Sequence, residues 1–149
     1  MLKDVIGKRS ETIKNTIERG AVKKFAEAIG DISSIYYDEE AGKNSRFKRN
    51  IAPPTFPVTF EFGAVADLTL PSKGLIHGEQ SFHYKRPLFV GEDVYCFTEV
   101  KDYYEKTGSF GNMGFLVLTR HGLDRNDELI FTEERVIIIN EEVRKGMLV

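Results

Sequence analysis

Residues 75–104 read LIHGEQSFHYKRPLFVGEDVYCFTEVKDYY and contain two predicted strands. The first covers residues 75–85 and ends at the Arg86-Pro87 break, because proline cannot donate to a strand ladder. A Gly91-Glu92-Asp93 turn then leads into a second strand over residues 94–104. Aromatic and β-branched runs that are separated by such breakers are typical of antiparallel strands. The stretch therefore predicts the first hairpin of an antiparallel sheet.

The C-terminal third continues this pattern. Residues 113–121, MGFLVLTRH, and residues 129–139, LIFTEERVIII, are rich in strand-forming side chains. The polar turn at residues 122–127 joins them. Four strands in succession predict an antiparallel meander.

Helical signals lie before this sheet. Residues 11–18 alternate loosely and predict a first strand. Residues 21–29 carry apolar side chains at i, i+3, i+4 and i+7, which is one face of a helix that ends at Gly30. Acidic residues 38–40 favour the start of a short helix.

A second, buried helix is predicted in the segment APPTFPVTFEF, residues 52–62. The two prolines at 53 and 54 enforce extended backbone, and Thr55 can cap a helix that continues to Phe62. Its side chains are apolar on nearly all sides, so we expect it to be buried. Helices grouped before a meander indicate an α+β fold.

The composition of the chain narrows the range of functions to consider. We expect residues 1–149 to form a single domain. The chain is 41% hydrophobic and 30% charged, with a formal net charge of −2 and no basic stripe, so no nucleic-acid partner is expected. Its apolar runs are too short to span a membrane, and the N-terminus lacks a signal-peptide core, so we expect a cytoplasmic protein.

No motif for a metal or cofactor is visible. The single cysteine, Cys96, cannot form an internal disulfide or a zinc site, and its apolar surroundings predict a small buried side chain. The sequence shows neither a Ser-His-Asp order nor a glycine-rich phosphate loop. We therefore expect no metal and no cofactor.

Four segments together resemble a known family. They are KKFAEAIGD (23–31), APPTFPVTF (52–60), LIHGEQSFHYKRPLFVGEDV (75–94) and GLDRNDELIFTEERVIII (122–139). Their order and spacing are similar to those of MaoC-like dehydratases. Within this family, the chain most resembles the N-terminal half of two-part FAS1-like hydroxyacyl dehydratases and the non-catalytic subunit of mycobacterial-type heterodimers. The resemblance implies a single hotdog fold, in which a curved antiparallel sheet wraps a long central helix.

The resemblance also locates a candidate catalytic loop. Catalytic relatives carry a pattern similar to G-D-x-N-P-x-H, in which the Asp and His act on the substrate and a water. Asp31 matches the Asp, but Tyr36 stands at the His position. A tyrosine titrates near ~10, so it can donate a hydrogen bond but is a poor base at neutral pH. Two alternatives stay open: Asp31 faces the substrate or bonds its own turn, and Tyr36 binds substrate or packs in the core.

His77 and Glu79 form a second candidate pair. At alternate positions of one strand they would share a face, and the carboxylate would raise the imidazole pKa. The pair is either a substitute acid–base couple or a structural hydrogen bond, and Gly78 between them can permit a bulge. His83 and His121 have no clustered ligands, and we expect them on the surface or at strand edges.

The resemblance implies an acyl thioester of CoA or acyl carrier protein (ACP) as substrate. Backbone N–H groups at Thr55 and Phe56 are candidates to polarise the thioester carbonyl. Phe56 and Phe60, with Phe62, either line an acyl tunnel or fill the core. Basic side chains at the tunnel mouth suit an acidic carrier or nucleotide phosphates, or are simply solvated; they are Arg46, Lys48, Arg49, Lys85 and Arg86.

These observations predict a subunit of an (R)-3-hydroxyacyl-thioester dehydratase, or enoyl-thioester hydratase, of fatty-acid metabolism that works as a dimer. It is either the substrate-binding half beside a catalytic hotdog subunit, or a homodimer that uses Asp31 or the His77/Glu79 pair. A non-enzymatic acyl-thioester-binding protein and an acyl-CoA thioesterase using Glu61 are the alternatives.

Overall fold

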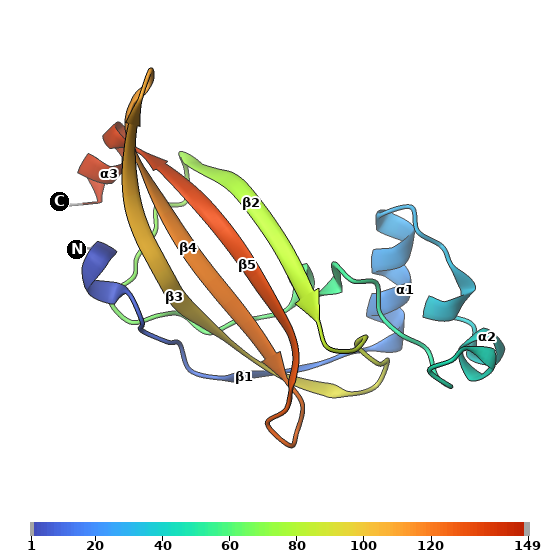
Figure 1. Cartoon of the computed structure of the whole chain (residues 1–149). Helices are drawn as coiled ribbons and strands as arrows, with labels where there is room; N and C mark the ends of the chain where they lie inside the picture. The colour runs from blue at the N-terminus through green and yellow to red at the C-terminus, as the bar shows by residue number, and fades with distance from the viewer. Residues whose placement is uncertain (1, 148–149) are drawn as a thin grey trace.

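One five-stranded antiparallel sheet organises the molecule, for which a computed structural model describes residues 2–147 (Figure 1). The strand order is β1-β3-β4-β5-β2. The strands are β1 (Ile13–Thr16), β2 (Leu75–Tyr84), β3 (Asp93–Gly108), β4 (Gly111–Leu123) and β5 (Leu129–Asn140). All five lie where the sequence predicts strands, and the α+β class is confirmed.

The prediction that residues 75–85 and 94–104 pair with each other as a hairpin is wrong. Strand β2 pairs with β5, from Leu75 opposite Ile139 to Tyr84 opposite Phe131, and not with β3. Strands β3, β4 and β5 form a three-stranded meander. The connection after Tyr84 crosses the end of the sheet, so that β2 occupies one outer edge and β1 the other. Local periodicity predicts that a segment forms a strand, but it does not predict which strand pairs with it.

Short helices gather at the two ends of the sheet (Figure 1). The 3-10 helix η1 (Leu2–Val5) and α3 (Glu141–Gly146) lie at one end. At the other end lie α1 (Arg19–Ala28), the 3-10 helix η2 (Ser34–Tyr36) and α2 (Glu39–Asn44). The predicted amphipathic helix is confirmed by α1, which buries Val22 and Ala26. The acidic start of α2 is also confirmed, because the Asp38 side chain accepts a hydrogen bond from the Glu40 amide.

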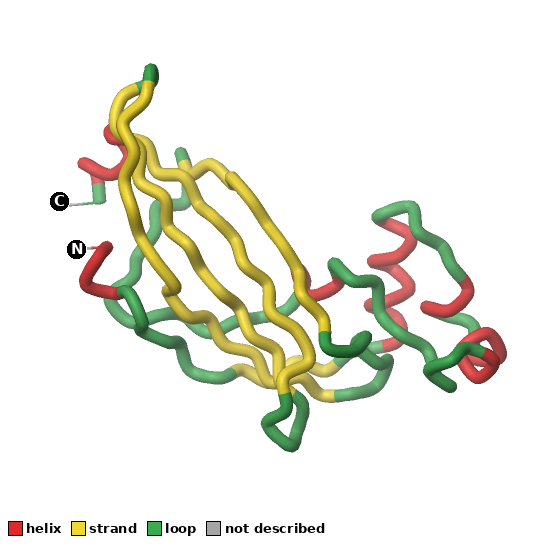
Figure 2. Tube along the Cα trace, in the orientation of Figure 1, coloured by secondary structure: helices red, strands yellow, loops and turns green. Residues whose placement is uncertain are grey.

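The predicted buried helix through Phe62 is not formed. Its place is taken by η3 (Phe56–Thr59), a single 3-10 turn, and Thr55 makes no capping side-chain bond. Proline, β-branched and aromatic residues dominate this segment and disfavour a continuing α-helix. The chain is extended again at Phe60, and residues 61–74 then lead to β2 without helix or strand (Figure 2).

Two apolar clusters lie on the inner face of the sheet, which is the face that carries Phe131 and Ile139. The first cluster lies near α1 and includes Tyr36, Phe56 and Phe131. The second lies near α3 and includes Leu116 and Ile139. Cys96 is fully buried in the first cluster, as predicted, and burial raises the pKa of its thiol to about 12.

No helix within residues 2–147 is both long enough and apolar enough to cross a bilayer.

Candidate functional site

The candidate catalytic loop begins where α1 ends. Gly30 adopts a left-handed conformation (φ +75°), which a glycine accommodates without strain, and the Asp31 amide donates to the Ala26 carbonyl. The loop then turns through η2, which places Tyr36 in the first apolar cluster with only 8% of its surface exposed. Asp31 itself is exposed.

Tyr36 and Asp31 are in direct contact. The Tyr36 hydroxyl donates a hydrogen bond to Asp31 Oδ2 over 3.2 Å. Burial, and then the negative charge of Asp31, raise the pKa of Tyr36 above its usual value. The phenol therefore stays protonated at neutral pH and acts as a donor, not as a base.

A small hollow adjoins this loop. A cavity of about 310 Å³ lies between α1 and the loop, and Ala26, Ile32 and Tyr37 are among the residues that line it. Ile32 is 66% exposed and Tyr37 is 40% exposed. Apolar side chains with this exposure are accessible to a ligand or a partner chain.

The residues predicted to bind the thioester lie in and around η3. The Phe56 amide donates to the Pro53 carbonyl over 2.9 Å, so this N–H group is already engaged. The Phe56 ring is buried, with its centroid 5.6 Å from that of Phe60, and Phe60 in turn lies 6.3 Å from Phe131. Both rings belong to the packing of the first cluster, whereas Thr55 is exposed.

His77 and Glu79 do not share a face. A β-bulge at Gly78 shifts the register, so that His77 lies opposite Ile137 and Glu79 lies opposite Val136. Directly opposed residues project to the same side, and Ile137 and Val136 point to different sides of β5. The predicted polar pair is therefore separated by the bulge.

His77 is also remote from Asp31. It lies seven residues before Tyr84, whose hydroxyl bonds the Pro54 carbonyl beside η3. A strand rises about 3.3 Å per residue, so His77 lies on the order of 20 Å from that end of β2. The two candidate catalytic groups belong to opposite ends of the sheet.

Two other histidines complete the set. His83 is exposed on β2, as predicted. His121 lies on the central strand β4 and not at an edge, and it is half-buried: its ring stacks on Phe97 at 4.6 Å, and burial lowers its pKa.

Two of the predicted basic residues, Arg49 and Arg86, come together near the loop. An isolated bridge between Ile51 and Phe89 joins the segment after α2 to the segment after β2. Arg49 and Arg86 both lie over the Phe89 ring, at 4.3 and 4.7 Å from its centroid. Arg86 is neutralised by Glu92, with two contacts of 3.0 Å. In the described part of the chain, no carboxylate forms an ion pair with Arg49.

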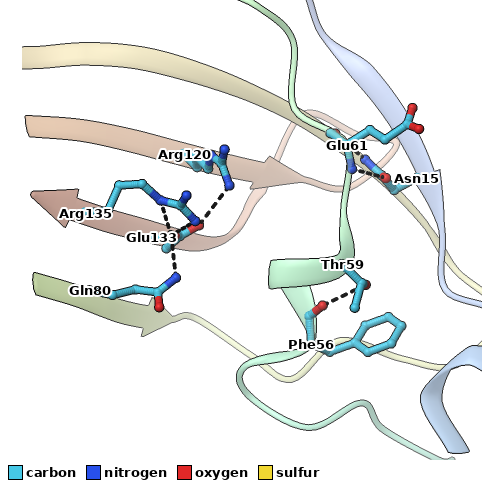
Figure 3. Close-up of polar contacts among 8 residues, drawn as sticks. All are labelled: Asn15, Phe56, Thr59, Glu61, Gln80, Arg120, Glu133 and Arg135. Carbon is cyan, nitrogen blue, oxygen red and sulfur yellow. Dashed lines mark hydrogen bonds and ion pairs between the residues drawn. The ribbon is translucent and has the colours of Figure 1, made fainter. Parts of the chain in front are cut away.

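Sequence reasoning missed a polar group on the inner face, shown in Figure 3. Glu133 is completely buried, and its Oε1 accepts from Gln80 Nε2 at 2.8 Å and from Arg135 Nε at 2.7 Å. Arg120 lies 3.8 Å from the other carboxylate oxygen, Oε2. The signal was present in LIFTEERVIII, where charges at 133 and 135 interrupt one face of an otherwise apolar strand.

Residues 2–147 contain no group of three or more His, Cys, Asp or Glu side chains placed to hold a metal. Glu61 lies on the extended segment after η3, where its backbone is bonded to Asn15 and the residue is exposed (Figure 3). It lies two residues beyond the end of η3 and is not itself helical.

Comparison with known proteins identifies the family. Residues 4–133 match the model of the FAS1-like dehydratase domain region. A UPF0336 protein of Thermobifida fusca is 35% identical over 99 residues, which are 62% of this chain and 65% of the relative. A UPF0336 protein of Streptomyces avermitilis is 38% identical over 82 residues, or 51% of this chain and 55% of the relative. The matches thus span less than two thirds of these relatives.

Solved structures share the fold. The HadBC (3R-hydroxyacyl-ACP dehydratase) complex of Mycobacterium tuberculosis gives a TM-score of 0.74 at 15% identity, covering 93% of this chain and 99% of that one. The ChsH1-ChsH2 complex of the same organism gives 0.74 at 20% identity, with coverage of 92% and 85%. The (R)-hydratase of A. caviae gives 0.68 at 22% identity, with coverage of 91% and 96%. The hotdog fold and the MaoC-like resemblance are thereby confirmed.

Proposed function

This chain belongs to the family of FAS1-like dehydratase domain regions, and from that premise we propose that it is the substrate-binding subunit of an (R)-3-hydroxyacyl-thioester dehydratase. A second hotdog chain supplies the acid–base groups of the hydro-lyase reaction. This chain supplies part of the acyl-binding wall.

The contact between Tyr36 and Asp31 carries the proposal. Hydration of a carbon–carbon double bond needs a group that takes a proton near neutral pH. The Tyr36 pKa is raised, and its hydroxyl is directed at the Asp31 carboxylate. His77 lies on the far part of β2, His121 is stacked on Phe97 and His83 is exposed on β2; no histidine of residues 2–147 is hydrogen-bonded to Tyr36 or Asp31. The loop therefore has the shape of a catalytic loop without its base.

The exposed edge of the sheet supports the proposal that a partner chain binds. Strand β2 is ten residues long, pairs with β5 and with no other strand of residues 2–147, and leaves residues 76–81 exposed. An open edge of this length offers backbone donors and acceptors to another strand. Two of the solved proteins with this fold, HadBC and ChsH1-ChsH2, are complexes of two chains by their names.

The basic side chains near the loop support the proposal that the acyl group arrives on an anionic carrier. Arg46 lies over Phe47, Arg49 lies over Phe89, and the two rings are 6.5 Å apart. Guanidinium groups held against aromatic rings are well placed for phosphate or carboxylate groups. We propose that this surface receives the CoA nucleotide or an ACP while the acyl chain enters beside η3.

Turnover of crotonyl-CoA by the chain alone, by a partner hotdog chain alone, and by both together tests the proposal. We expect little hydration by this chain alone and strong hydration by the two chains together. In the two-chain complex, Asp31→Asn and Tyr36→Phe should change kcat less than about twofold. Efficient hydration by the isolated chain, abolished by Asp31→Asn, would contradict the proposal.

A non-enzymatic acyl-thioester-binding protein is the second candidate, because the same Tyr36–Asp31 contact removes the base in either case. It predicts acyl-CoA binding with no stimulation of any hotdog partner. The comparison of the single chains with the pair separates the two functions.

A further inference from the structure

A second, larger cavity lies at the end of the sheet that is remote from the candidate catalytic loop. Its volume is about 670 Å³, which falls within the roughly 300–1,000 Å³ that is usual for small-molecule sites. It is lined from η1, β3, α3 and the segment that leads to β2, so that residues near both ends of the described chain meet there (Figure 1). The loop at residues 31–37 contributes nothing to this lining, and the cavity is a site of its own.

The cavity contains a guanidinium group that neighbouring side chains hold in place. Arg144 Nη1 donates to the Tyr103 hydroxyl over 3.3 Å and lies 3.0 Å from Glu105 Oε1. Arg144 Nη2 donates to the Asn112 side chain. The Tyr103 ring reaches this position over Gly114, where a Cβ would overlap it. Arginine has five N–H donors, so donors remain for an anion, and the ordered group loses little further entropy on binding one.

The charges around the cavity leave one cation without a counter-ion. Three carboxylates line the cavity, and each is paired with a cation. The pairs are Asp67 with Lys8 at 2.8 Å, Glu105 with Arg144 at 3.0 Å and Glu141 with Lys145 at 3.8 Å. Lys3 also lines the cavity and forms no ion pair with any residue of 2–147. The lining is therefore complementary to a ligand that carries a single negative charge.

Apolar side chains complete the wall. Leu2 and Met147 line the cavity, and both pack against the second apolar cluster. Each methylene that a ligand buries against such a surface raises its affinity by about fourfold. The site thus combines an apolar wall with a net positive charge, which suits an amphipathic anion.

We infer that this cavity binds an aliphatic carboxylic acid of moderate length. The carboxylate contacts Lys3 and Arg144. The aliphatic chain lies against Leu2 and Met147. A dianion such as a phosphate monoester is disfavoured, because Glu105 would repel its second charge. The inference does not depend on the proposed function, since the two sites share no residue.

Octanoate, octanol and octylamine have the same chain and different charge, and their binding to the full-length chain tests this inference. Calorimetry measures the affinities, and heteronuclear NMR of the isotope-labelled chain locates the ligand. We expect octanoate to bind at least about tenfold more tightly than octanol, which cannot form charge-assisted hydrogen bonds, and octylamine to bind most weakly. Amide resonances of residues 2–3, 103–105 and 141–147 should shift, and those of residues 31–37 should not.

Three results would overturn the inference: no binding of octanoate, equal affinity for octanoate and octylamine, or shifts confined to residues 31–37. None of them bears on the proposed function, which the crotonyl-CoA assay of the two-chain complex tests separately.

Substitutions at Lys3 test the assigned contact. Lys3→Gln removes the unpaired cation and should weaken octanoate binding by about two- to fivefold, whereas Lys3→Arg keeps the charge and should bind like wild type. Lys14→Gln on β1 is the matched control, because it removes an exposed cation that does not line the cavity. No loss of affinity in Lys3→Gln, or an equal loss in Lys3→Gln and Lys14→Gln, would contradict the inference.

Discussion

A phenol at position 36 changes the chemistry of the loop. An imidazole exchanges protons near neutral pH, whereas the Tyr36 phenol, with its raised pKa, holds its proton and donates it to Asp31 in a hydrogen bond. The family resemblance assigned both residues to one loop, but the contact between them was not predicted. The direction of the bond could not be predicted, because it depends on the burial of the ring in a core that distant segments build.

The buried thiol of Cys96 predicts a specific alkaline response. Its pKa is raised to about 12 by burial, while an unfolded thiol titrates near ~8.5. Above ~8.5 the unfolded state releases its proton first, so stability falls as pH rises, by up to about 1.4 kcal/mol per pH unit. Urea unfolding of wild type from about pH 8 to 10 should show a loss of about 2 kcal/mol.

The Cys96→Ala variant is the control for this response. It should flatten the curve below about pH 10, before Tyr36 and Tyr84, whose pKa values are both raised, begin to contribute. An equally steep curve in that variant would assign the pH dependence to another group.

Glu133 should be among the most sensitive single positions. Glu133→Gln removes the charge that compensates Arg120 and Arg135, and leaving buried charges without a partner costs about 3 kcal/mol when they are partly solvated. Chemical denaturation measures the loss. Glu134→Gln, one residue along on the other face, removes only an exposed ion pair with Lys101 and should cost less than about 1 kcal/mol. Equal losses of stability in the two variants would mean that the burial of Glu133 is not the cause of its sensitivity.

At the scale of elements, close packing of two strands depends on Gly122. A Cβ at this position of β4 would overlap the Phe131 ring, whose Cδ1 and Cζ would lie 2.7 Å away, and Phe131 is fully buried. Gly122→Ala should therefore destabilise the fold by about 1–3 kcal/mol, measured by denaturant unfolding. Gly108→Ala meets nothing within 4 Å and should change stability by less than about 0.5 kcal/mol.

Periodicity predicted the elements whose apolar faces are regular, and failed where composition and periodicity disagreed. Helix α1 was predicted because Val22 and Ala26 share one face. The segment at Pro57 was predicted to be a buried helix from its apolar character alone, although proline and β-branched side chains oppose a helix there. The partner of β2 was missed because no local signal distinguishes β3 from β5.

At the scale of the molecule, the exposed edge of β2 should govern assembly. Ile76 lies on that edge and is 47% exposed. If the edge pairs with a partner strand, Ile76→Lys should weaken association by about fivefold or more without loss of folding. Sedimentation velocity measures the association. Leu129→Lys, at an exposed residue (36%) at the start of β5, is the control and should leave association unchanged.

The order of strands in the sheet also determines how the chain reaches its native state. Strands β3, β4 and β5 are joined by short connections, so their pairing closes small loops. The outer strands must find partners far away in the chain: Ile13 pairs with Cys96, and Leu75 pairs with Ile139. Closing such long loops is slow, on the order of milliseconds to seconds for sheets of this kind. We therefore expect the meander to form first and β1 and β2 to add to its flanks last.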